Sequence, residues 1–355
     1  MGHGGGQASA AERLRAIDSH LSQASGQAPP TATADDSASS EEAPGLTLAE
    51  REHFHSQGFL VIRGAAPREA CTEACAEAFA LAGKDPHDRH TWYRPQPAGR
   101  TRSGTRHPAH ADRWQADLEA SMIRAEHSPA AWRIRTAPRM HQCFSALWGT
   151  ERLWLNGTES PEAARPLFNL KPPVADAHPG WGGGTYLHWD ASVEPGSAPP
   201  LHGGLQIQGV LYLADTPVNG GGIRVVAGFH RMLEDDPQLA QRWHEIRQRA
   251  PDNGPDGCMD LAELSGLPVT QLAARAGDLI VWNSLLPHGT GKNTAAEPRR
   301  AMFVSMTPVD RVVAEAPAGQ AYSTLRAQRE AAWRGDCHEA GLSQLGRRLI
   351  GLEDW

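Results

Sequence analysis

Long hydrophobic runs are missing from this chain of 355 residues. No apolar stretch approaches the roughly 18 residues that a membrane-spanning helix needs. The first residues also lack a charged segment followed by an apolar one, which is the pattern of a secretory signal. A myristoylation signal is incomplete, because Gly6 stands where Ser or Thr is required. We therefore expect a cytoplasmic protein that does not associate with membranes.

Cysteine and excess positive charge are also scarce. The five cysteines are scattered, unlike those of a disulfide framework. Cys71 and Cys75 lie on one face of an expected helix, but no second pair completes a zinc site, so we expect them to be buried or half-buried. A net charge of −7 argues against binding nucleic acid through a general positive field.

Residues 1–45 contain almost no aromatic or β-branched side chains and are rich in Gly, Ala, Ser, Gln and Asp. Such a segment cannot bury enough apolar surface to offset its ordering entropy, so we expect a disordered tail. Thr47 and Glu50 then form a capping box, which predicts that a helix opens the folded part near Leu46. We interpret residues 46–355 as one domain.

Within that domain, helices and loops are expected over residues 46–150 and strands over residues 151–310. The expected helices include 47–55, 67–82 and 138–148, a helical insertion at 232–265 and a C-terminal helical extension at 311–355. The expected strands are Phe59–Arg63, Leu153–Asn156, Leu167–Lys171, Leu205–Leu213, Gly221–Val226, Asp278–Asn283 and Arg299–Thr307. Short strands with Gly-rich turns predict a mainly β fold, a sandwich or jelly-roll barrel with flanking helices.

Two potential metal ligands, His188 and Asp190, lie two residues apart. On a strand, such side chains point to the same side while Trp189 faces away. The pair supplies two ligands of the 2-His-1-carboxylate triad of non-haem Fe(II) oxygenases. A second triplet, His110 to Asp112, has no strand to orient it, and we interpret it as surface loop.

A third ligand must come from another strand, and His288 stands beside glycines that allow a close backbone approach. Taken alone, His288 is equally an ordinary turn histidine. The strand that follows opens with two arginines, and alternation places Arg299 on the face of Ala301 and Phe303, with Arg300 opposite. If the small and aromatic face lines the barrel, Arg299 is buried and needs a carboxylate partner. The alternative is that Arg299 forms an ordinary ion pair at the surface.

The dicarboxylate 2-oxoglutarate would provide that partner, because its far carboxylate matches a guanidinium and its keto-acid end chelates iron. Three protein ligands leave open positions for the keto acid and for O₂. The residues thus predict a site for Fe(II) and 2-oxoglutarate.

The ordered combination of motifs resembles the phytanoyl-CoA dioxygenase family of 2-oxoglutarate oxygenases. The matching segments are His188–Asp190, Gln208–Asp215, Gly221–Arg231, Leu286–Asn293 and Pro298–Arg299. The resemblance spans about Leu46 to Pro308 and is strongest from Phe168 onward. It implies a double-stranded β-helix core of the cupin-like, jelly-roll type, Fe(II), and conversion of 2-oxoglutarate to succinate and CO₂ as O₂ is consumed.

Carried over by position, the resemblance also implies individual roles. The implied iron ligands are His188, Asp190 and His288, and the implied cosubstrate contacts are Arg299, Thr290, Lys171 and Gln208. Arg299 would pair with the distal carboxylate and Thr290 would match a family hydroxyl near the cosubstrate. For Lys171 and Gln208 a plain structural role is an equal alternative.

Two departures limit what the family implies. Members that halogenate have a small residue in place of the carboxylate, so Asp190 favours hydroxylation or another C–H oxidation of a small organic substrate. Ala301 stands where some relatives have a hydroxyl, which removes one cosubstrate contact.

No feature of the sequence indicates a CoA site. A cupin-like isomerase or lyase with another metal, and a non-catalytic protein that binds metal or 2-oxoglutarate, remain alternatives.

Residues 84–113 lack periodicity and are rich in Arg, His and Pro, which predicts a long loop and a potential substrate lid. Its basic side chains either recognise an anionic substrate or belong to a solvated loop. These side chains are Lys84, Arg89, Arg94, Arg100, Arg102, Arg106 and Arg113. Trp92, Tyr93 and Trp114 are candidates for apolar walls or for ordinary packing.

Overall fold

The structure is a computed structural model, and its described part starts at Gly45. It covers residues 45–94, 121–125, 127–161, 163, 166–178, 181–184, 187–190, 207–249, 265–316, 320–335 and 341–355. The expected tail, most of the Arg-rich segment and the triplet from His110 to Asp112 lie outside the described residues. One domain over residues 46–355 stays a proposal.

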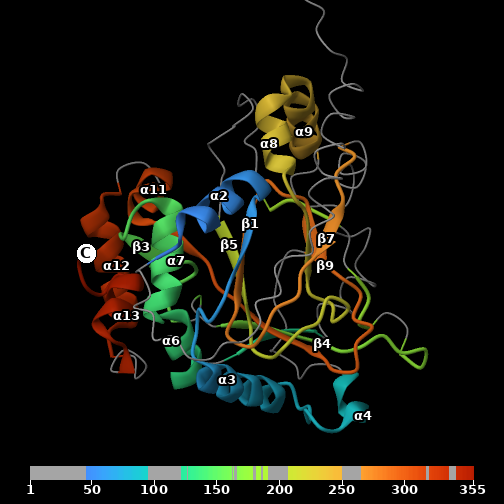
Figure 1. Ribbon diagram of the computed structural model, residues 1–355. Coiled ribbons are helices and arrows are strands. Elements are labelled where there is room, and N and C mark those ends of the chain that lie inside the picture. Colours follow the sequence, from blue (N-terminus) through green and yellow to red (C-terminus); the bar gives the residue numbers. More distant parts are fainter. Residues whose placement is uncertain are drawn as a thin grey trace, which may run out of the picture. The chain divides into compact units, whose positions relative to one another are not determined.

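Antiparallel sheets form the centre of the described part, and helices flank them (Figure 1). The six-stranded sheet has the order β1 (Phe59–Ile62), β8 (Leu279–Asn283), β5 (Ile207–Tyr212), β10 (Arg299–Phe303), β4 (Leu167–Lys171) and β2 (Met122–Arg124). The three-stranded sheet has the order β7 (Val269–Gln271), β6 (Ile223–Val226) and β9 (His288–Thr290). From β8 to β10 the chain passes from the large sheet to the small one and back, as in a jelly roll. The expected mainly β, cupin-like fold is confirmed.

One face of the large sheet is directed toward the small sheet. Val210 of β5 and Ile280 of β8 are fully buried in one cluster with Ile223 and Val225 of β6. Residues two apart on a strand share a face, so this inner face also carries Gln208, Tyr212 and, from β10, Arg299. The inner face is therefore apolar in its middle and polar toward both ends.

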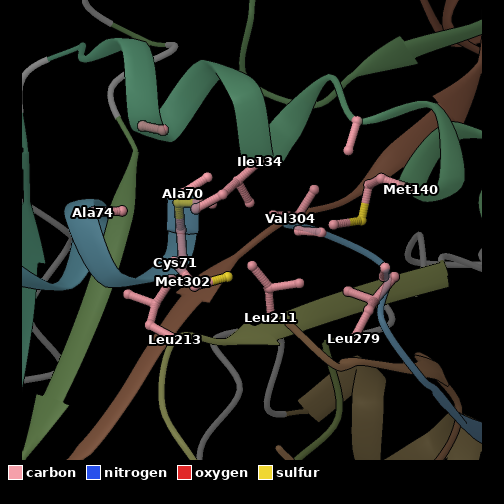
Figure 2. Packing of buried hydrophobic residues seen from close by; sticks show 14 of the residues in the cluster. Ala70, Cys71, Ala74, Ile134, Met140, Leu211, Leu213, Leu279, Met302 and Val304 are labelled. Carbon is pink, nitrogen blue, oxygen red and sulfur yellow. The ribbon is translucent and has the colours of Figure 1, made fainter. Parts of the chain in front are cut away.

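The outer face of the large sheet packs against helices α3 (Arg68–Leu81), α6 (Pro129–Arg135) and α7 (Pro138–Trp148). Figure 2 shows Met302 of the sheet beside Ala70 and Cys71 of α3, and Leu211 and Leu279 belong to the same buried cluster. The small side chains let the helix approach the sheet closely, and burying this surface at about 25 cal/mol per Å² stabilises the fold. Cys71 is buried and Cys75 half-buried, as expected.

The expected strand Arg299–Thr307 is in fact two strands, so that prediction was wrong in detail. β10 ends at Phe303, and β11 (Met306–Pro308) pairs with β3 (Leu153–Leu155) in a separate sheet. The Val304 amide still donates to the Gly209 carbonyl at 3.0 Å, and a Cβ atom at Gly209 would collide with the Val304 carbonyl. This close approach marks the point where the chain leaves the large sheet.

Three further expectations need correction. The helical insertion consists of α8 (Phe229–Asp235) and α9 (Pro237–Arg249), beginning before residue 232, and residues 250–264 lie outside the described part. The metal-ligand segment is an isolated β-bridge at His188 rather than a strand. The expected loop at 84–113 contains a short helix, α4 (Arg89–Trp92). The three-residue strands β7 and β9 were not expected, because they are too short to show a period.

Helices α2, α11, α12 and α13 complete the described elements. The capping box of Thr47 and Glu50 opens α2 (Leu48–Gln57) as predicted. Within the C-terminal residues lie α11 (Val309–Glu315), α12 (Tyr322–Trp333) and α13 (Gln344–Leu349). Among the described helices, none has the length and apolar character to cross a membrane.

Asn293 joins several segments around the small sheet and is fully buried. Its side-chain Nδ2 donates to the carbonyls of Lys171 and Glu297, both at 3.0 Å. Its backbone amide donates to the Gly182 carbonyl at 2.9 Å, and its carbonyl accepts from the Val174 amide at 2.8 Å. One residue thus fixes the end of β4 and the segment that precedes His188.

We predict that Asn293→Ala lowers the free energy of unfolding by about 2–4 kcal/mol, because buried carbonyls lose their donors. Urea unfolding measures the change. The control is Asn219→Ala, where the exposed amide makes the change worth less than about 0.5 kcal/mol. Equal stabilities of the two variants would contradict the role of Asn293.

Candidate metal centre

The backbones of His188 and His288 are joined by two hydrogen bonds. The His188 amide donates to the His288 carbonyl at 2.9 Å, and the reverse bond measures 3.0 Å. This bridge brings the imidazole rings to a centroid separation of 4.5 Å. His288 opens β9 and pairs with Val225 of β6, so the small sheet positions both histidines.

The Asp190 carboxylate completes the group. Its Oδ1 lies 3.6 Å from the His188 Nε2, and its Oδ2 lies 3.3 Å from the His288 Nε2. The potential ligand atoms of these three residues all lie within 4.8 Å of one another. Metal–ligand bonds of about 2.1 Å place neighbouring ligand atoms about 3 Å apart, so one ion can reach all three residues.

Two features prepare these side chains for a cation. The His288 Nδ1 lies 2.9 Å from the Leu286 carbonyl, which directs the Nε2 lone pair into the site when Nδ1 carries the proton. Burial raises the pKa of the Asp190 carboxyl, but the hydrogen bond and charge of His288, the charge of His188 and the hydrogen bond from Gln208 bring that pKa well below its usual range. The Asp190 carboxyl is thus kept in the charged form that metal binding needs.

Trp189 points away from the site, as alternation predicts. It is 1% exposed, and its ring packs against Phe229 at 5.8 Å and Trp243 at 6.2 Å between centroids. These aromatic contacts anchor the segment that carries His188 and Asp190.

Arg299 is 2% exposed on the inner face of the large sheet. Its Nη1 donates to the Asn169 Oδ1 at 3.3 Å, and its guanidinium lies 5.2 Å from the ring centroid of Tyr212. None of the ion pairs among the described residues involves Arg299, and its buried Nε has no hydrogen-bond partner there. By contrast, Arg300 points to the opposite face and pairs with Glu297 at 2.8 Å.

Lys171 and Thr290 lie next to this arginine. Lys171 is the cross-strand neighbour of Arg299, is 5% exposed, and donates from Nζ to the Thr290 Oγ1 at 2.9 Å. The structure therefore brings Arg299, Lys171 and Thr290 together. Two buried cations at one place favour an anionic guest.

Gln208 also lies in the site, but at the other end. Its Nε2 donates to the Asp190 Oδ2 at 2.6 Å, so its contact is with a potential metal ligand rather than with the cationic end. Tyr212 lies four residues after Gln208 on β5, which corresponds to about 13 Å of strand. The inner face thus has the metal ligands at one end and the cations at the other.

An elongated dicarboxylate with a chelating keto acid matches this order. The orphaned Nε of Arg299 requires an acceptor, and a carboxylate provides one. The donor set of two imidazoles and one carboxylate suits Fe(II). The residues present therefore fit both iron and 2-oxoglutarate.

Lys84 is buried, which differs from the expectation of a solvated loop at this position. It is 6% exposed, its Nζ donates to the Trp92 carbonyl at 2.7 Å, and it lies 4.9 Å from the ring centroid of Trp181. Burial lowers the pKa of Lys84 to about 8. Trp92 is also buried, at 3% exposure, and Tyr93 stacks on His178 at 4.2 Å, so both pack within the fold. Trp114 lies outside the described residues.

Sequence reasoning missed Asn169 and Tyr212, the residues that contact Arg299. Period-two alternation would have found them. Asn169 lies two residues before Lys171, and Tyr212 lies four residues after Gln208, each on the same strand face.

Comparisons with known proteins agree with this chemistry. Residues 54–301 match the family model described as phytanoyl-CoA dioxygenase (PhyH). A Dictyostelium discoideum protein named as a candidate phytanoyl-CoA dioxygenase is 24% identical over 283 residues, which is 74% of this chain and 75% of that protein.

Solved structures are similar at lower identity. The epimerase SnoN in complex with Fe³⁺, alpha ketoglutarate and nogalamycin RO is 20% identical with a TM-score of 0.48, covering 77% of this chain and 91% of that one. EctD from S. alaskensis with 2-oxoglutarate and 5-hydroxyectoine is 17% identical with a TM-score of 0.49, covering 78% and 80%. HygX from Streptomyces hygroscopicus with nickel and 2-oxoglutarate bound is 19% identical with a TM-score of 0.44, covering 75% and 88%.

We predict that Asp190→Ala and His288→Ala each weaken Fe(II) binding about 100-fold or more, because each removes a ligand from the ion. Anaerobic calorimetric titration with Fe(II) measures the affinity. His110→Ala serves as the control, because the sequence predicts a surface loop at its triplet, and it should bind Fe(II) like the unaltered chain. A loss of Fe(II) affinity in His110→Ala as large as in the other two variants would contradict the assignment of the metal ligands.

Proposed function

The chain belongs to the phytanoyl-CoA dioxygenase family, and we propose that His188, Asp190 and His288 hold its iron for the oxidation of a C–H bond in a small organic substrate. Family membership makes it a non-haem iron enzyme that uses 2-oxoglutarate and O₂. The iron, when bound, couples decarboxylation of 2-oxoglutarate to succinate with the activation of O₂. The protein's own side chains bind, orient and neutralise the reactants.

The observation that carries the residue roles is the buried guanidinium of Arg299, which has no acidic partner among the described residues. Leaving a cation buried and unpaired costs several kcal/mol, so its retention supports a ligand carboxylate as the partner. Lys171 and Thr290 adjoin it and are proposed to contact the same carboxylate. A cupin-like isomerase or lyase that works without 2-oxoglutarate, or a protein that binds only the metal, would have no use for this arrangement.

Asp190 supports oxidation rather than halogenation. Its carboxylate takes the position that a halide needs, and its depressed pKa keeps it charged and ready to bind the metal. We therefore propose hydroxylation or a related C–H oxidation as the reaction.

The substrate is proposed to be anionic, and none of the described residues of the site indicates CoA. Arg89 and Arg94 are exposed at the start of the Arg-rich segment, and the Arg89 Nη2 donates to the Ala296 carbonyl at 3.4 Å. This contact puts the start of the segment beside the turn that precedes β10. The remaining arginines of this group lie outside the described residues, and a solvated loop is the rival interpretation.

We predict that Arg299→Gln raises the Kd of 2-oxoglutarate about 100-fold, because a charge-assisted pair contributes about 3 kcal/mol. The charge-transfer absorbance of the anaerobic Fe(II)–keto acid complex follows binding. Arg300→Gln, on the adjacent residue with the opposite orientation, should leave the Kd within about twofold. Equal effects in the two variants would remove Arg299 from the cosubstrate site.

For the substrate, we predict that replacing Arg100, Arg102 and Arg106 together by Gln raises KM about tenfold or more at unchanged kcat, because uniform binding is lost. The substrate is first identified by succinate release from a panel of metabolites. Arg51→Gln together with Arg242→Gln, at exposed positions elsewhere, is the control. An unchanged KM in the triple variant would favour the solvated loop.

A further inference from the structure

Gln208 makes a contact that a cosubstrate-binding residue does not need. It lies on the inner face of β5, directly across from Trp282 of β8, whose ring lies 5.2 Å from that of His288. From this position its Nε2 donates to the Asp190 Oδ2 at 2.6 Å. The large sheet thereby reaches across to the carboxylate that is attached to the small sheet.

The contact between Gln208 and Asp190 is important because the nearest backbone bridge does not include Asp190 itself. The backbone bridge to His288 is at His188, two residues before Asp190, and the residues after Asp190 lie outside the described part. A carboxylate can rotate and bind a metal through one oxygen or both. An amide N–H that holds Oδ2 leaves Oδ1 for the metal.

The amide orientation agrees with this arrangement. The opposite orientation would place the Gln208 Oε1 against the negative charge of Asp190, which is repulsive. In the orientation observed, Oε1 is buried and has no hydrogen-bond partner among the described residues. A buried acceptor beside a metal ligand needs a donor, and water bound at the metal is one that the site itself would provide.

We propose that Gln208 is a positioning residue that fixes Asp190 for coordination through a single oxygen. This inference rests on the proposed function for the identity of the three metal ligands. It assigns Gln208 to the metal end of the site and takes it away from the cationic end, where Arg299 and Lys171 lie. Residues that orient a metal ligand in this way commonly contribute about 10- to 100-fold to metal affinity.

Gln208→Met tests the proposal, because methionine keeps the length of the side chain and removes the donor. Co(II) is the probe, since its visible absorption reports the number and geometry of its ligands. We expect the Kd of Co(II) to rise about 10- to 100-fold, with a change in the shape of the Co(II) spectrum as the second oxygen of Asp190 becomes free to bind. At saturating Fe(II), the Kd of 2-oxoglutarate should stay within about twofold.

The controls separate this proposal from the one on which it rests. Gln241→Met, on the exposed face of α9, should leave both the spectrum and the affinity unchanged. An unchanged Co(II) spectrum in Gln208→Met, together with weaker 2-oxoglutarate binding, would overturn the positioning role. Gln208 would then be assigned as a residue that binds the cosubstrate. Full Co(II) affinity in Asp190→Ala would instead overturn the metal ligands themselves. Gln208→Leu, which also lacks a donor, carries the same test if the methionine variant does not fold.

Discussion

Two backbone hydrogen bonds between His188 and His288 hold the candidate site together. They join segments that are far apart in the sequence, and they set the distance between the two imidazoles. Every other feature of the metal end follows from them. Asp190 meets both rings because it lies two residues after one histidine, and Gln208 meets Asp190 because the small sheet places that carboxylate opposite β5. The backbone pairing thus determines which side chains can meet at the metal end of the site.

Period-two alternation predicted most of the site, because a strand fixes the face of each residue without any knowledge of its neighbours. It separated Arg299 from Arg300 and placed Trp189 away from Asp190. It also gave the bounds of β4, and helical periodicity gave those of α7. It could not predict that Gln208 touches Asp190, because that contact depends on the separation of two sheets. Nor could it predict β9, which is too short to carry a period and is held by its partners.

The polar ends of the inner face cost stability, and the outer face supplies it. Arg299 is buried with only the Asn169 amide oxygen and the Tyr212 ring to compensate it. The helices on the opposite face pack apolar and small side chains against the same strands (Figure 2). Strands β4, β5 and β10 therefore each have two functions, because alternate residues belong to the helix-covered core and to the candidate site.

Burial alone does not identify a functional cation, as two lysines show. Lys171 and Lys84 are 5% and 6% exposed, and both donate a hydrogen bond from Nζ. Lys84 donates to the Trp92 carbonyl and lies over Trp181, so its surroundings already satisfy a cation. Lys171 stands beside a second buried cation, Arg299, which the fold alone would not favour. A bound anion would compensate this pair of like charges, and the pair therefore supports the proposed cosubstrate site.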